Sequence, residues 1–503
     1  MPFLRIAMLA AVLLSGLSLA GPAAAQDLPP GEGREVVQAV CAACHGVDVI
    51  ASQHRSEADW NDVVVRMIGN GAALTDEQYT TVVHYLATAL GPEKPAPAAT
   101  PSQSMTQGAS AEAPQVSSAA RAVHEAALVL DTHFDTPSLF SRPGWDIADR
   151  HDVNVDGSQV DLPRMIDGGV DGGFFAVFIG QGPRTEAGHN AARAAGLVRA
   201  MEIRQMVATH PDQFELATTP DDAIRIAGEG KRFVFMSMEN AYPMAGDPGM
   251  MQAFYALGVR MAGFAHFKNN DFADSATDTP EWHGLSPKGK ALLAEMNRLG
   301  VIPDPSHSSD EVLDQILDLS KTPVVLSHSG ARAIFDHPRN VPDALIRKLA
   351  DKGGVIQINA YNGYMIAAPA NAERDKAMAD FNAAMAAKYG PRGGWTEADV
   401  VKITAERRAL TAKYPMPRAN LDDLMKHLLH AIKVAGVDHV GLCGDFDGGG
   451  GIDGYNSIAD LPAVTERLLQ AGYSKEDIAK IWGGNVLRVM RAVQDYAASQ
   501  KAA

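Results

Sequence analysis

Residues 128–135 read Leu-Val-Leu-Asp-Thr-His-Phe-Asp, and this stretch predicts a buried strand that ends in chemically active side chains. A short apolar run of this kind is typical of a buried strand. His133 and Asp135 are two residues apart, so they should point to the same face. An imidazole and a carboxylate that converge there suit a metal or a general base. The alternative is a capping aspartate beside a structural histidine, and the rest of the chain decides between the two.

Downstream of Arg121 the chain alternates apolar runs with segments of helical periodicity, such as residues 289–299, 309–319 and 342–352. Eight strand–helix units over this length predict an α/β fold, a (β/α)8 TIM barrel spanning residues 121–495. Residues 370–418, rich in Ala, Lys, Arg and Glu, are expected to form a helical insertion that serves as a lid or an oligomer contact. The eight runs that predict strands are residues 127–131, 173–179, 232–238, 259–265, 300–303, 323–327, 354–359 and 439–443.

Side chains that commonly bind metals follow six of these eight runs. In a barrel of this type the catalytic groups lie at the carboxyl ends of the strands. Three histidines and two or more carboxylates suffice for two metal ions that share a carboxylate. Nitrogen and oxygen ligands without thiolate suit Zn²⁺, and Mn²⁺, Co²⁺ or Fe²⁺ would also fit. Paired metals activate water and polarise a carbonyl, which predicts amide or ester hydrolysis. The residues concerned are His133, Asp135, Glu239, His266, Asp304, His307, His328, Asp445 and Asp447.

Ordered motifs through this domain resemble the membrane (renal-type) dipeptidases, a dinuclear zinc family of the amidohydrolase group. They include Asp-Thr-His-Phe-Asp at 131–135, Ser-Met-Glu-Asn at 237–240, Ser-His-Ser at 327–329 and Gly-Asp-Phe-Asp-Gly at 444–448. Further matches occur at residues 258–260, 284–287, 297–301, 339–342 and 484–489.

The resemblance implies a set of metal ligands. His133 and Asp135 would hold one metal, and Glu239 would bridge both. His307 and His328 would hold the second metal. Because Pro303 and Pro305 flank Asp304, and proline lacks an amide donor, the backbone around His307 is expected to depart from a regular strand.

The resemblance also implies three catalytic roles. His266 would stabilise the oxyanion of the tetrahedral intermediate. Arg339 would bind the terminal carboxylate of the substrate through its planar guanidinium, unless it is a surface residue near a helix end. Asp445 would take a proton from the activated water and pass it to the leaving amine. Asp447 and the glycines at 448–451 are interpreted as a turn, because no phosphate-loop pattern surrounds them.

Residues 1–25 are typical of a secretory signal. Arg5 is the only charge, residues 6–20 are apolar, and three alanines at 23–25 fit a cleavage site. The apolar run is shorter than most membrane spans, so no stable span is expected after signal removal; the alternative is an uncleaved anchor. Together with the cysteine motif that follows, this predicts an exported protein of the bacterial periplasm.

Residues 30–90 contain Cys41-Ala42-Ala43-Cys44-His45, the C-x-x-C-H pattern of covalent haem c attachment. His45 would be an axial ligand and Met67 a candidate for the other, with His54 and His84 as alternatives. A redox dithiol or half of a zinc site are rival interpretations. This segment resembles a small all-α class I c-type cytochrome domain, with a closing helix at 82–90. A haem at this position would exchange electrons with a redox partner. Residues 91–120, rich in Pro, Ala, Ser and Thr, predict a flexible tether.

The net charge of −16 argues against nucleic acid as a partner. The leading hypothesis is a zinc dipeptidase that could accept a D-residue on the carboxyl side and carries a tethered haem domain; a homodimer would fit the family. One alternative is an amidase or lactonase of the same barrel type acting on another substrate. Another is an electron-transfer protein in which the barrel is only a binding module.

Overall fold

The computed structural model describes residues 28–41, 50, 60, 63–64, 74–91, 116–389 and 395–502. The chain divides into two compact units, Met1–Gln107 and Gly108–Ala503. The predicted signal at 1–25, most of the predicted tether, and the haem-site residues Cys44, His45 and Met67 lie outside the described residues, and only the backbone of Cys41 is described.

The described part of the first unit is helical. It contains α1 (Arg34–Val36), η1 (Val37–Cys41) and α4 (Asp76–Ala89), and α4 includes most of the predicted closing helix. Thr75 caps α4 in a reciprocal arrangement with Gln78, as expected for a helix that begins at this point. The Trp60 indole donates to the carbonyl oxygen of Leu90, and both side chains are buried in a small apolar core.

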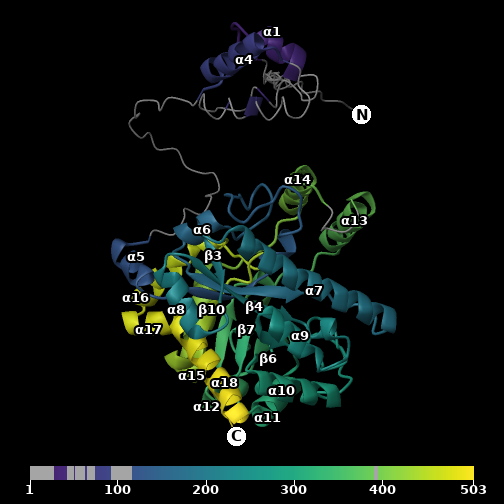
Figure 1. Ribbon diagram of the computed structural model, residues 1–503, viewed down its shortest axis with the longest axis vertical. Coiled ribbons are helices and arrows are strands. Elements are labelled where there is room, and N and C mark those ends of the chain that lie inside the picture. Colours follow the sequence, from purple (N-terminus) through teal and green to yellow (C-terminus); the bar gives the residue numbers. More distant parts are fainter. Residues whose placement is uncertain are drawn as a thin grey trace, which may run out of the picture. The chain divides into compact units, whose positions relative to one another are not determined.

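The second unit is an α/β fold built on curled parallel sheets (Figure 1). One sheet has the order β1-β2-β4-β5-β6, with β3 paired to β4, and the other has the order β10-β9-β7-β8. Each of the eight predicted strands is present, with shifted ends, and β3 and β8 are short additions that we did not predict. The strands are β1 (Leu130–Phe134), β2 (Gly172–Phe178), β3 (Phe214–Leu216), β4 (Arg232–Glu239), β5 (Val259–Gly263), β6 (Ile302–Asp304), β7 (Val325–Ala331), β8 (Asn340–Val341), β9 (Val355–Asn359) and β10 (Val440–Cys443).

The helices lie around the strands (Figure 1), and most begin at a Ser, Thr, Asp or Asn whose side chain accepts a backbone N–H. The predicted helices at 289–299, 309–319 and 342–352 are confirmed as α10, α11 and α12. The predicted insertion is a pair of helices, α13 and α14, with a small apolar core of their own. The helices are α5 (Ser118–Glu125), α6 (Leu162–Asp167), α7 (Glu186–Thr209), α8 (Pro220–Gly228), α9 (Met250–Leu257), α10 (Pro287–Leu299), α11 (Asp310–Leu319), α12 (Asp343–Asp351), α13 (Ala372–Tyr389), α14 (Glu397–Lys413), α15 (Leu421–Ala435), α16 (Pro462–Gln470), α17 (Lys475–Ala479) and α18 (Asn485–Ala502).

Side-chain hydrogen bonds join the two sheets between β6 and β7 and also between β1 and β10, where the Asp135 N–H additionally donates to the Phe446 carbonyl oxygen. Among the described residues no backbone ladder joins β6 to β7, and Pro303 has no amide N–H to offer one. Instead, a carboxylate oxygen of Asp304 accepts the Ser327 N–H at 3.1 Å. At the other seam, Asp131 on β1 accepts the Gly444 N–H at 2.6 Å. The predicted barrel is therefore present as a barrel-like arrangement with two polar seams.

The interior changes from apolar to polar along the strands. Inward side chains near the strand starts, including Phe233 and Val325, pack in one cluster with the apolar residues of α18. Because alternate residues of a strand share a face, Phe235 is followed on that face by Ser237 and Glu239. The apolar cluster with α18 thus closes the amino ends of the strands, and polar groups collect at the carboxyl ends.

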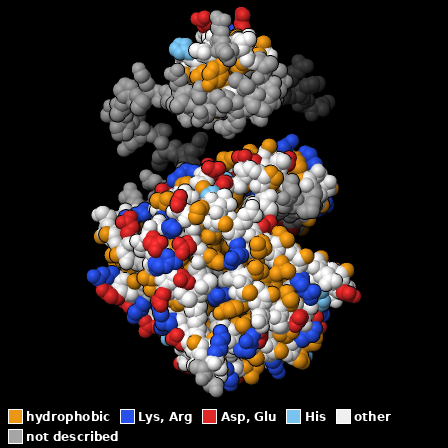
Figure 2. Space-filling view, in the orientation of Figure 1, with side chains coloured by type: hydrophobic (Ala, Val, Ile, Leu, Met, Phe, Trp, Pro, Cys, Tyr) orange, Lys and Arg blue, Asp and Glu red, His pale blue; other side chains and the backbone are white. Residues whose placement is uncertain are grey.

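Acidic and basic side chains are interspersed over the visible face of the second unit (Figure 2). Ion pairs of this unit include Arg225–Glu215 and Arg491–Asp221. No helix of the described residues is both long enough and apolar enough to cross a membrane.

His124 fastens α5 to the rest of the unit. Its Nδ1 lies 2.7 Å from Thr465 Oγ1, and its Nε2 lies 2.8 Å from the carbonyl oxygen of Gly168. Thr465 Oγ1 also accepts the Trp482 indole N–H, so its own proton is free for His124 Nδ1. Neutral His124 with its proton on Nε2 thus donates to the Gly168 carbonyl oxygen and accepts from Thr465 at Nδ1. Burial is the main cause that lowers the pKa of His124 to about 4.

We predict that this histidine makes the unit less stable in mild acid. The unfolded state binds a proton near the ordinary histidine pKa, and the folded state resists it, so stability falls as pH drops from about 6.5 toward 4. Between about pH 7.5 and pH 5, the shifted pKa of His124 lowers the free energy of unfolding by about 2 kcal/mol. Urea unfolding of the wild type and of His124→Gln at both pH values checks it. If stability fell equally with pH in the two proteins, His124 would not be the group responsible.

Candidate metal centre

Seven of the predicted site residues come together at the carboxyl ends of the strands. Their ligand atoms form three overlapping groups, each within 4.8 Å: His133, Glu239 and His328; Glu239, His266 and His307; and His133, Asp135 and Asp445. Glu239 and His133 each belong to two groups, so the residues form one centre and not three separate sites.

Glu239, the last residue of β4, lies at the middle of this centre. Its Oε1 is 3.0 Å from His307 Nε2, 3.3 Å from His328 Nε2 and 3.6 Å from His266 Nε2. Its Oε2 is 3.5 Å from His133 Nε2. Glu239 is only 6% exposed, so nearly all of its hydration has been replaced by these four imidazoles. A carboxylate held in this way can be shared between two cations.

The histidine nitrogens are arranged as cation ligands. His307 Nε2 and His328 Nε2 are 2.8 Å apart, and two ring nitrogens at that distance can share at most one proton. His133 Nε2 is buried without a hydrogen-bond partner, 3.4 Å from Asp135 Oδ2. Buried polar atoms that lack partners are rare in proteins unless an ion or water completes them. Nitrogen and carboxylate donors without thiolate fit Zn²⁺.

The charges of the centre depend on one another. Burial would raise the pKa of Glu239, but the nearby His133 and His266 hold it well below its usual range. Burial opposes protonation of His133, yet Glu239 and Asp135 raise its pKa well above normal. Burial lowers the pKa of His328 to about 3 and also lowers that of His307. Most of the imidazoles are therefore neutral and present lone pairs, which is the form that binds metals.

Asp445 lies at the edge of the centre beside Asp135. Its Oδ2 accepts a hydrogen bond of 3.1 Å from Asn359 Nδ2. Burial, together with the charges of Asp135 and Glu239, raises the pKa of Asp445 to about 7. Gly448 packs directly on these two carboxylates, since a Cβ there would lie 2.1 Å from Asp135 Oδ2 and 2.6 Å from Asp445 Oδ1. The turn predicted at 448–451 therefore also shapes the site.

Arg339 is buried next to the centre, which excludes the surface interpretation. Its Nη2 donates to the carbonyl oxygen of His328 at 3.0 Å, and its guanidinium lies 5.2 Å from the centroid of the Tyr364 ring. Its Nε has no hydrogen-bond partner, and no carboxylate in the described ranges forms an ion pair with it. A buried, uncompensated guanidinium is costly and suits an anionic ligand.

Several site residues adopt left-handed backbone conformations. His307 has φ 67°, Asp445 has φ 52° and Asn240 has φ 66°. Such values are unusual for residues with a side chain, and they concentrate at functional sites. For His307 this bears out the expected departure after Pro303 and Pro305, and the imidazole nevertheless reaches Glu239.

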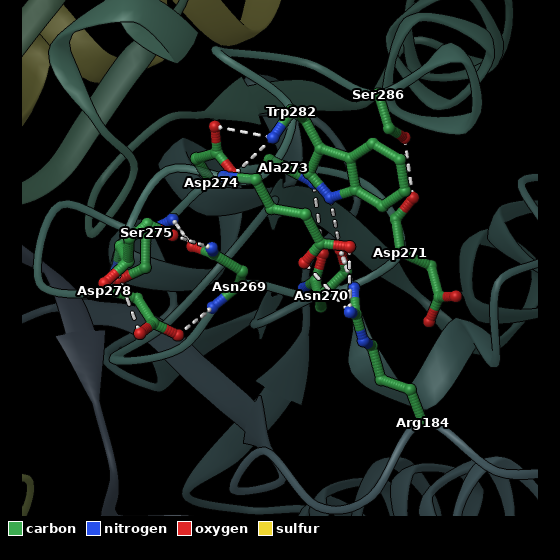
Figure 3. A network of polar contacts seen from close by, with 12 residues as sticks. Arg184, Asn269, Asn270, Asp271, Ala273, Asp274, Ser275, Asp278, Trp282 and Ser286 are labelled. Atoms are coloured by element: carbon green, nitrogen blue, oxygen red, sulfur yellow. Dashed lines mark hydrogen bonds and ion pairs between the residues drawn. The ribbon is translucent and has the colours of Figure 1, made fainter.

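The loop that carries His266 is tied down by a network of polar contacts (Figure 3). Ser275 Oγ donates to the carbonyl oxygen of His266 at 2.5 Å. Asp274 accepts the backbone N–H groups of Glu281, Trp282 and Gly284. Arg184 donates to the Asn270 carbonyl and pairs with Glu281, which holds the loop to the segment after β2. His266 is therefore presented from a fixed loop.

Several residues that hold these groups in place were not predicted from the sequence. Asp131 accepts the His133 N–H at 3.0 Å and joins β1 to Gly444, a role that its place in the 131–135 motif does not indicate. Asn359 and Tyr364 were not singled out, although both lie at the end of a predicted strand or just beyond it. Their position at the carboxyl end of β9 was the available signal.

A parallel α/β fold with a histidine and carboxylate centre at the carboxyl ends of its strands defines a metal-dependent hydrolase of the barrel type. The model of the membrane dipeptidase family, peptidase family M19, matches residues 117–503. The chain belongs to this family, and it is a metal-dependent dipeptidase.

Similar proteins come from fungi and bacteria. Dipeptidase tcpJ of Claviceps purpurea is 33% identical over 349 residues, which are 68% of this chain and 71% of that protein. The crystal structure of the probable dipeptidase PvdM from Pseudomonas aeruginosa is 33% identical, has a TM-score of 0.64, and covers 75% of this chain and 98% of its own. A metallopeptidase from Rhodobacter sphaeroides, liganded with a phosphinate mimic of L-Ala-D-Ala, is 23% identical with a TM-score of 0.57, covers 73% of this chain and 99% of its own, and shows the shared fold.

Proposed function

We propose that the protein hydrolyses dipeptides with free termini at a two-zinc centre, with His133 and Asp135 on one ion, His307 and His328 on the other, and Glu239 shared. The observation that carries the proposal is the single buried carboxylate of Glu239 within reach of four imidazoles. Bound zinc ions would lower the pKa of the attacking water and polarise the scissile carbonyl.

The residues around the ions supply binding and proton transfer. Arg339 pairs with the free carboxylate of the substrate, because its buried Nε has no hydrogen-bond partner and no carboxylate of the described residues forms an ion pair with it. Asp445, held by Asn359, accepts the proton of the attacking water and returns it to the leaving amine.

His266 donates a hydrogen bond to the carbonyl oxygen as negative charge develops on it. Burial lowers the pKa of His266, so it acts as a neutral imidazole. Its fixed loop positions the donor before the reaction, and a donor already in place costs no reorganisation during the step.

A D-residue at the carboxyl side of the dipeptide is included in the proposal. Support comes from the Rhodobacter sphaeroides relative, which was solved with a mimic of L-Ala-D-Ala.

The test is release of free amino acids from a panel of L,L and L,D dipeptides, with zinc and then with chelator. Chelator-sensitive release is the expected result. Lack of release from every dipeptide, with zinc bound, would favour an amidase or lactonase.

We predict that Arg339→Met lowers kcat/KM for dipeptides at least about tenfold, because a charge-assisted pair to the substrate is lost. The change should fall mainly on KM. Dipeptide amides, which lack the carboxylate, should be poor substrates for both proteins and to the same extent. If Arg339→Met impaired the amide as strongly as the free dipeptide, the carboxylate assignment would be wrong.

We predict that Asp445→Asn lowers kcat about 10²-fold or more while zinc stays bound, because an amide cannot carry the proton. The amide oxygen can still accept from Asn359, so the local fold is kept. Zinc content measured beside kcat separates the roles. Loss of zinc in step with activity would make Asp445 a metal ligand instead.

We further propose that residues 1–25 direct export to the periplasm and that Cys41 and Cys44 carry covalent haem c with His45 and Met67 as axial ligands. The support is the C-x-x-C-H motif in a chain with three cysteines, followed by the small helical core that contains α4. Intact mass and the haem absorption spectrum of periplasmic protein test it. A mass without haem would refute the haem assignment, and a protein that retains residue 1 would refute the export signal.

A further inference from the structure

We propose that Asp304 and Ser327 act as positioning residues that fix the tautomer of His328, so that its Nε2 lone pair always faces the metal. The inference rests on the two-zinc centre proposed above and adds a residue pair that sets how one ligand is presented. It concerns the polar seam between β6 and β7, where His328 contacts Glu239.

The contacts form a continuous chain of hydrogen bonds. Asp304 Oδ2 lies 2.5 Å from Ser327 Oγ, and Ser327 Oγ lies 2.8 Å from His328 Nδ1. On the other side of the ring, His328 Nε2 lies 3.3 Å from Glu239 Oε1. All four residues are buried, so solvent does not compete for these positions.

Counting protons along the chain gives the tautomer. A carboxylate is acceptor-only, so the single hydroxyl proton of Ser327 goes to Asp304. Ser327 Oγ is then left as an acceptor toward His328, and Nδ1 must carry the ring proton. A neutral imidazole with its proton on Nδ1 has its lone pair on Nε2, the atom that faces the centre.

The other carboxylate oxygen of Asp304 is held by the backbone, so the two oxygens of this side chain have different roles. Oδ1 accepts two backbone N–H groups, from Ser306 at 3.0 Å and from Ser327 at 3.1 Å. If Asn replaced Asp304, its carbonyl oxygen would stay on these two donors, and its NH2 would face Ser327 Oγ. The hydroxyl proton would then turn to His328 Nδ1 and place the ring proton on Nε2, where it blocks the metal.

The neighbouring ligand shows the contrast. His307 Nδ1 is buried with no hydrogen-bond partner, so the described structure gives its tautomer no such support. Outer partners of metal-bound histidines typically change metal affinity by about 10–100-fold when they are removed. Of His307 and His328, only His328 thus has an outer partner among the described residues that controls its protonation site.

The experiment compares zinc affinity, by competition with a chromophoric chelator, in the full-length wild type and in Ser327→Ala, Asp304→Asn and the double variant. Ser327→Ala should weaken one zinc equivalent about tenfold, because the tautomer is no longer fixed. Asp304→Asn should weaken it further, because the wrong tautomer is imposed. The double variant should recover to the level of Ser327→Ala, since no hydroxyl remains to relay the change.

Ser237→Ala is the matched control. Its hydroxyl is buried and unpartnered, two residues before Glu239 on β4, and its loss should leave both zinc affinities at the wild-type values. A double variant that binds zinc no more tightly than Asp304→Asn, or variants that bind it as tightly as the wild type, would overturn the proposed role of Asp304 and Ser327. Binding of two zinc ions by the wild type would in either case leave the proposed function intact. A wild type that binds no zinc would overturn both.

Discussion

Burial of a carboxylate costs free energy unless opposite charges and hydrogen bonds replace the lost water, and the interior of this protein is arranged around one such group. Glu239 is within 3.6 Å of the ring nitrogens of four histidines, which lie on β1, in the loops after β5 and β6, and on β7. Two of these histidines are kept neutral by their own burial. Each of these two neutral imidazoles presents a lone pair on one ring nitrogen, and cations are the natural complement of lone pairs gathered around a carboxylate.

The seams of the barrel serve the same centre. Pro303 within β6 has no N–H to offer β7, and Asp304 links the two strands and also holds Ser327 beside His328. At the opposite seam, Asp131 links β1 to Gly444 and fixes the backbone of His133. Each seam carboxylate thus joins two strands and steadies a candidate ligand. Substitutions that remove these hydrogen bonds to the backbone would affect both the barrel and the metals, which links the stability of the fold to the geometry of the site.

The fold and most of the centre could be predicted from the sequence because the relevant signals are local. Apolar runs placed all eight principal strands, and the residues after them included His133, Glu239 and His328. The ends of the strands were less accurate: β1 is Leu130–Phe134 instead of the predicted 127–131, because the polar Asp131, Thr132 and His133 are buried in the strand, which an apolar run alone does not reveal. Long-range partners were not predictable. Nothing in the sequence joins Asn359 to Asp445, or Asp304 to Ser327, until the sheets bring them together.

The most direct test of the central role of Glu239 is the number of zinc ions bound per chain in the wild type and in Glu239→Gln. The amide keeps the size of the side chain and removes the charge that the surrounding imidazoles and the metals share. Two zinc ions in the wild type and a loss of both from the variant under the same chelator competition is the predicted result. Retention of two zinc ions by Glu239→Gln at wild-type affinity would contradict the account.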